Sequence, residues 1–125
     1  MSLTAAAIVY ALGQVTVVAP AVAPEHDVAY VELRAGMNDA AIDKIEANEA
    51  LHADDPARLI NLGIAHAREG EDAEARRYFD AAMHSDVRVE LETATGEWTD
   101  SRVLAKTALS KLDSGDFARR LASSR

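Results

Sequence analysis

The sequence predicts a mainly α-helical fold of about two to three antiparallel helix pairs, with a short β-hairpin inserted near residues 87–98. Three observations lead to this prediction. Apolar residues recur at helical spacing between residues 56 and 83, with helix start and stop signals around them. A related pattern occurs earlier in the chain, over residues 26–53. Apolar and charged residues alternate over 87–91, which is typical of a strand.

The best-defined helix pair lies between residues 55 and 84. Asp55 is suited to cap a helix that begins at Pro56, where the missing N–H costs nothing. Gly70 ends that helix, and Asp72 is suited to cap the second one. A turn this short forces the two helices to pack antiparallel. Two small residues allow their close approach: Gly63 and Ala75.

This stretch resembles the tetratricopeptide repeat (TPR), a helix pair with conserved large and small positions. Leu59 and Leu62-Gly63 match the early positions, and His66 stands where a tyrosine is usual. Ala75 and Phe79 match the later small and aromatic positions. The resemblance covers roughly residues 26–120. It implies a TPR-like α-solenoid whose curved inner surface binds peptides or other proteins.

A degenerate repeat unit precedes this helix pair, and a modified unit follows it. The first unit lies one repeat period earlier, at 26–53, with helices expected at 30–36 and 39–51. This step pairs Arg34 with Arg68, Gly36 with Gly70, Ala41 with Ala75, and Ile45 with Phe79. In the forward direction the hairpin intervenes, with a turn at Thr95-Gly96. A helix capped by Asp100 or Ser101 then runs to Gly115, and a short last helix follows.

Residues 1–23 form a separate apolar segment, followed by the TPR-like helical domain at 24–125. The segment has no charge and ends in Ala21-Val22-Ala23, which is typical of a secretory signal peptide, although it lacks a positive start. A membrane anchor and a packed helix, or a strand at 15–18, are the alternatives. A signal peptide would place the protein in the periplasm or outside the cell. Without one, a cytoplasmic location is expected.

Charge and composition exclude several functions. The net charge is −8, with a body of −12 over residues 1–100 and a basic tail of +4 over 101–125. An acidic body disfavours nucleic acid as a partner. No cysteine is present, and no histidine has a metal-ligand spacing. We therefore expect no enzyme, catalytic residue, metal or cofactor, and we interpret His66 as a packing residue.

The resemblance places the partner-binding surface on the first helix of each pair. Arginines at Arg34 and Arg68 are expected to project along one groove, although both are also suited to interact with helix C-termini. Trp98 is either a core anchor or an interface residue. The inner positions of the second unit are Ile60, Asn61, Ile64, Ala67 and Arg68.

Two functions fit this sequence. The first is a non-enzymatic module that binds an extended or helical segment of another, bacterial-type protein. The second is a self-associating scaffold, because few helical repeats bury little surface and at least three are normally needed for stability. No integral membrane role is expected beyond a signal or anchor at the N-terminus.

Overall fold

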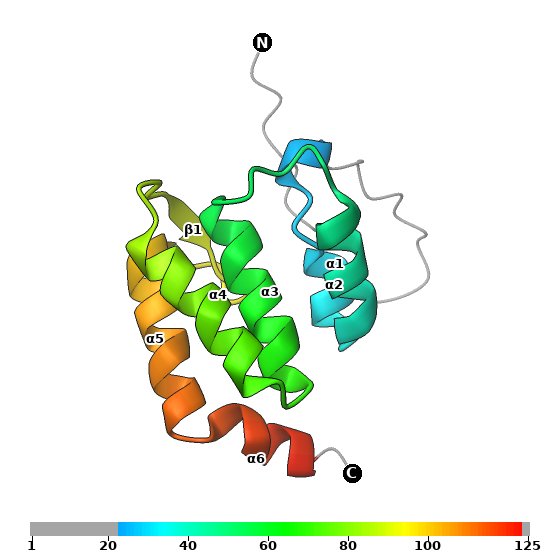
Figure 1. The fold of residues 1–125 in the computed structure, drawn as a ribbon, viewed down its shortest axis with the longest axis vertical. Helices are drawn as coiled ribbons and strands as arrows, with labels where there is room; N and C mark the ends of the chain where they lie inside the picture. The colour runs from blue at the N-terminus through cyan, green and yellow to red at the C-terminus, as the bar shows by residue number, and fades with distance from the viewer. Residues whose placement is uncertain (1–22, 124–125) are drawn as a thin grey trace.

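The computed structural model describes residues 23–123, and within this range the chain is mainly helical with one small sheet (Figure 1). The apolar segment 1–23 lies outside this range except for its last residue, Ala23, so its three interpretations stay predictions. A short 3-10 turn at Pro24–His26 comes first. The elements that follow are α1 (Tyr30–Arg34), α2 (Asn38–Ala47), α3 (Pro56–Arg68), α4 (Asp72–His84), β1 (Glu90–Glu92), β2 (Trp98–Asp100), α5 (Ser101–Asp113) and α6 (Asp116–Ser123).

The central helix pair, α3 and α4, forms as its end signals predict. The Asp55 carboxylate accepts a hydrogen bond of 3.1 Å from the backbone N–H of Arg58, and Pro56 is the first helical residue. Gly70 makes the turn with a φ of 78°, a conformation that glycine adopts at little cost. The expected cap of α4 is wrong by one residue, because Asp72 already lies in the helix and Glu71 precedes it without a side-chain cap.

The contact between Gly63 and Phe79 sets how closely α3 and α4 pack. Phe79 is fully buried, and its ring lies directly against the backbone of Gly63. A Cβ atom at position 63 would lie only 2.4 Å from Cε1 of Phe79. Glycine is therefore required at this position, because any side chain would occupy the space of the ring.

The first helix pair shares its turn glycine and two buried positions with the second. Gly36 ends α1 with a φ of 75°, close to the 78° of Gly70, its equivalent in the second pair. Ala41 and Ile45 on α2 are fully buried, as are their equivalents on α4. Helix α2 is shorter than expected, however, and ends at Ala47. Asn48 leaves the helical conformation there, and its side-chain oxygen accepts a hydrogen bond of 3.1 Å from the N–H of Ala50.

The predicted hairpin exists, but its strands lie later than expected. Its antiparallel register pairs Glu90 with Asp100, Leu91 with Thr99, and Glu92 with Trp98. Strand β2 has only three residues, because the turn closes at Glu97 and α5 begins at Ser101. Val87 and Val89, which the alternation assigned to a strand, consequently precede β1.

Helix α6 does not turn back along α5 as a second helix of a third pair would. Its red ribbon runs below the lower ends of α3, α4 and α5 in Figure 1. Gly115 allows the sharp turn with a φ of 74°. Phe117 then stacks against Phe79, with ring centroids 6.3 Å apart. Helix α6 therefore covers the end of the helix pair.

Ile64 on α3 connects the whole hydrophobic core. Three clusters of buried residues surround the helices: one between the first pair and α3, one at the α6 end, and one beneath the hairpin. The side chain of Ile64 packs against all three. Helix α3 is therefore the element on which the other helices assemble.

The Gly63–Phe79 contact yields the first prediction. Phe79→Ala is expected to lower the free energy of unfolding by about 3–5 kcal/mol, because it leaves a cavity the size of a ring. Gly63→Leu also destabilises, since the new side chain displaces the ring. Urea unfolding followed by circular dichroism measures both effects. Ala81→Leu, at an exposed site on α4, is the matched control. Core variants that unfold at the same urea concentration as the parent would contradict this packing.

Candidate functional site

Two adjoining hollows lie along the side of α3 that faces α1 and α5. The first has a volume of about 250 Å³ and lies between α1, α3 and the hairpin turn. Its walls are Tyr30, Leu33, Arg34, Asn61, Ile64, Arg68 and Ala94. The second has a volume of about 210 Å³ and lies between α3, α5 and α6. Its walls include Ile60, Ile64, Arg68, Leu104, Lys111 and Phe117.

Ile64 and Arg68 line both hollows, so the two adjoin each other, and together they are called the inner groove. The floor of the groove is mostly apolar. Cationic side chains stand along it, namely Arg34, Arg68 and Lys111, with Asp116 as the acidic residue on its walls. A surface of this kind favours an apolar segment that carries negative charge.

Five predicted binding residues line this groove: Arg34, Ile60, Asn61, Ile64 and Arg68. Ala67, also expected on the inner side, is instead buried in the core cluster at the α6 end. Trp98 does not line the groove. Its side chain is 66% exposed on the hairpin, so the interpretation as a core anchor is wrong.

Two of the groove residues also attach α1 to α3. The side-chain amide of Asn61 donates a hydrogen bond of 2.8 Å to the carbonyl oxygen of Val28. The guanidinium of Arg68 donates one of 2.8 Å to the carbonyl oxygen of Leu33, in the last turn of α1. Cations favour this end of a helix because its carbonyl groups carry partial negative charge. The same side chains thus border the groove and hold one of its walls.

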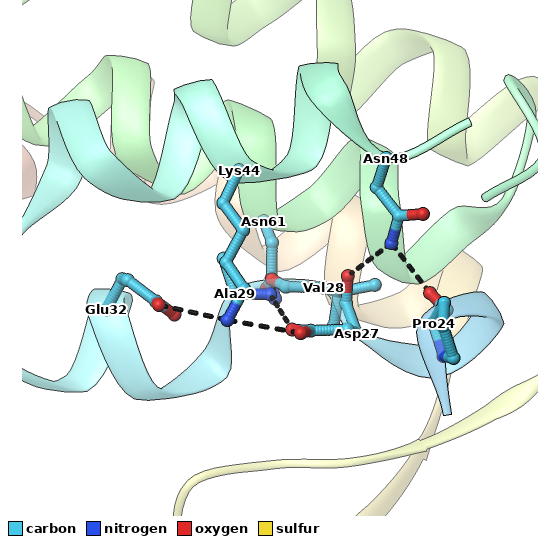
Figure 2. A network of polar contacts seen from close by, with 8 residues as sticks. All are labelled: Pro24, Asp27, Val28, Ala29, Glu32, Lys44, Asn48 and Asn61. Carbon is cyan, nitrogen blue, oxygen red and sulfur yellow. Dashed lines mark hydrogen bonds and ion pairs between the residues drawn. The ribbon is translucent and has the colours of Figure 1, made fainter. Parts of the chain in front are cut away.

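A polar network fixes the chain where it enters α1 (Figure 2). Lys44 on α2 lies between two carboxylates, 3.0 Å from Glu32 and 3.1 Å from Asp27. The pKa of Lys44 is raised above its ordinary value, chiefly by the hydrogen bond to Glu32 and next by the hydrogen bond to Asp27. The ammonium group therefore stays charged.

Asp27 in turn supports the residue that starts the helix. Its carboxylate accepts a hydrogen bond of 3.1 Å from the N–H of Ala29. Ala29 has a φ of 58°, a conformation that an alanine rarely adopts without such support. The amide of Asn48 donates a hydrogen bond of 2.6 Å to the carbonyl oxygen of Pro24 and one of 3.3 Å to that of Asp27. These contacts position Tyr30 and Arg34 at the groove.

His66 contacts an aromatic ring and a carboxylate. The ring of His66 stacks on Tyr78 with centroids 5.4 Å apart, and its Nδ1 lies 3.2 Å from a carboxylate oxygen of Glu71.

Within residues 23–123 there is no group of three or more metal-binding side chains that could hold an ion. No helix in that part of the chain has the length and apolar character needed to cross a membrane.

Several groove residues were not predicted from the sequence. Tyr30 and Leu33 lie on α1, the helix that also carries the predicted residue Arg34. Leu104 and Lys111 join the groove because α5 packs against α3, and Phe117 joins it because α6 crosses the end of α3. The apolar residues after Gly115 indicate a packed last helix, but no local pattern gives its direction.

Comparison with known proteins identifies no relative: the chain matches no protein-family model, no curated protein and no solved structure.

The Asn61 contact yields the second prediction. Asn61→Ala is expected to lower the free energy of unfolding by about 1–3 kcal/mol, because the Val28 carbonyl loses its partner. Asn61→Asp should destabilise more, since a carboxylate cannot donate and repels the carbonyl oxygen. Urea unfolding at pH 7 compares the two variants. Equal stability of Asn61→Asp and the parent would show that this bond does not hold α1 in place.

Proposed function

We propose that the chain is a non-enzymatic TPR-type helical repeat module that binds a peptide segment of a protein partner along its inner groove. The repeat assignment is supported by equivalent positions in the first and second helix pairs. Turn glycines with nearly the same φ, buried alanines and a buried large residue occur at the same places in both pairs. Repeats of this kind stack first helices side by side and present them to a ligand.

One observation carries the binding proposal. Arg34 and Arg68 are equivalent residues of consecutive units, and both line the hollow between α1 and α3. Ile64 provides an apolar floor between these helices and continues it into the second hollow. A groove that combines an apolar floor with arginines suits a peptide with large apolar and acidic residues.

The third prediction tests this groove with peptides selected for binding. Random peptides displayed on phage are selected against the immobilised protein, and the bound sequences are expected to combine large apolar residues with Asp or Glu. The dissociation constant of a selected, labelled peptide is then measured by fluorescence anisotropy. Arg34→Glu should weaken binding by about tenfold or more, since it replaces an attractive charge with a repulsive one.

Lys106→Glu is the matched control, because it makes the same charge change on α5 at an exposed residue outside the groove walls. It should leave the affinity within about twofold of the parent at physiological salt. Peptides that bind the Arg34→Glu protein as tightly as the parent would place the binding site elsewhere.

Self-association is the second candidate function, and one observation favours it. Val31 on α1 and Met37 just before α2 are 65% and 55% exposed. A second copy packed end to end would cover such residues, as neighbouring repeats do in longer arrays. Sedimentation velocity over a range of protein concentrations separates this function from peptide binding.

A further inference from the structure

The outer face of the hairpin carries an exposed tryptophan among acidic residues, away from the inner groove. Trp98 lies directly opposite Glu92 in the antiparallel register, and Asp100 lies opposite Glu90. Side chains two residues apart on a strand share a face, so these four residues lie on one side of the sheet. Leu91, between them, packs the other way, against the core beneath the hairpin.

The negative charge of this face is only partly compensated within the molecule. Arg88 pairs with Asp100 and holds the pKa of that carboxyl below its ordinary value. Glu90 and Glu92 form no ion pair with any cation among residues 23–119. Glu97, next to the tryptophan, is also exposed and has no ion pair within that range. An indole that is 66% exposed therefore shares its face of the sheet with the carboxylates of Glu90 and Glu92.

Hydrogen bonds from the start of α5 anchor the base of the hairpin. The backbone N–H of Ser101 donates a hydrogen bond of 2.8 Å to the carbonyl oxygen of Val89, and the Ser101 hydroxyl accepts one of 3.2 Å from the N–H of Val89. The guanidinium of Arg102 donates a hydrogen bond of 2.8 Å to the carbonyl oxygen of Ser85. A surface that is already ordered loses little conformational entropy when it binds a partner.

From this juxtaposition we propose that the outer face of the hairpin is a second interaction surface, which binds an arginine-bearing segment of a protein partner. The guanidinium of an arginine stacks on an indole ring and forms paired hydrogen bonds with carboxylates. The face supplies both groups: the ring of Trp98, and the carboxylates of Glu90 and Glu92. Charge complementarity selects a basic partner here, whereas the inner groove, with its arginines, suits an acidic one. The two surfaces therefore suit partners of opposite charge.

The fourth prediction uses Trp98 as its own reporter, because it is the single tryptophan of the chain. A tryptophan-free peptide with three arginines separated by serines is added to the full-length protein at low ionic strength. The emission of Trp98 should change with peptide concentration and saturate. The same peptide with citrulline, which keeps the shape without the charge, and one with glutamate should leave the emission unchanged.

Variants locate the site by anisotropy of a labelled arginine peptide. Trp98→Ala should weaken binding by roughly thirtyfold, as expected for an interface tryptophan. Glu92→Gln should weaken it by about fivefold, the upper range for an exposed charge pair. Glu46→Gln, which makes the same change at an exposed site on α2, is the matched control. Arg34→Glu should leave this binding intact, so failure here and failure of the groove proposal are distinguishable.

Three results would overturn the proposal. The first is an emission that the arginine peptide leaves unchanged up to millimolar concentration. The second is equal weakening by Glu92→Gln and Glu46→Gln, which would mean that only the overall charge matters. The third is an emission shift on raising the protein concentration without peptide, which would assign this face to a contact between copies of the chain.

Discussion

The close contact of Gly63 with Phe79 is the constraint on which the remaining structure depends. It lets α3 and α4 approach until the ring lies against backbone, with no room for a Cβ atom at position 63. The neighbouring residue Ile64 is thereby placed where all three core clusters meet. Phe117 of α6 completes the arrangement by stacking on the same Phe79 ring. One ring thus connects the central helix pair to the helix that covers its end.

The first helix pair depends more on polar contacts than the second. Helix α1 has only five residues, and Leu33 is its buried side chain. Hydrogen bonds from Asn61 and Arg68 attach the chain around α1 to α3, and Lys44 ties its start to α2. Since Asn61 and Arg68 also line the proposed groove, the residues best placed to contact a peptide are also structural. Changes that improve binding at these positions are therefore expected to affect stability, a common cost at functional sites.

Local signals in the sequence predict much of this fold. Pro56, Gly70 and the spacing of Leu59, Leu62 and Phe79 define the central helix pair, and the same period locates Gly36 and Ile45 in the first. Five groove residues follow from the resemblance to a repeat, which places the inner face on the first helix of each pair: four of them lie on α3, and Arg34 lies on α1.

Features that depend on distant parts of the chain were not predictable in this way. Trp98 lies opposite Glu92 because the turn between Thr93 and Glu97 fixes the register of the hairpin. Alternation over 87–91 cannot supply that register. Helix α6 crosses α3 because Phe117 reaches Phe79, a contact between residues far apart in the sequence. Ala67 faces the core for a related reason, since α5 and α6 close over its side.

Native-state hydrogen exchange tests most directly the claim that the other elements assemble on α3. The account predicts that amides in the middle of α3 and α4 exchange only through global unfolding, with the denaturant dependence of the whole molecule. Amides of α1 and of the hairpin should exchange through smaller openings of lower free energy. The account is contradicted if α3 exchanges as readily as α1, or if α5 and α6 stay protected under conditions in which α3 has already exchanged.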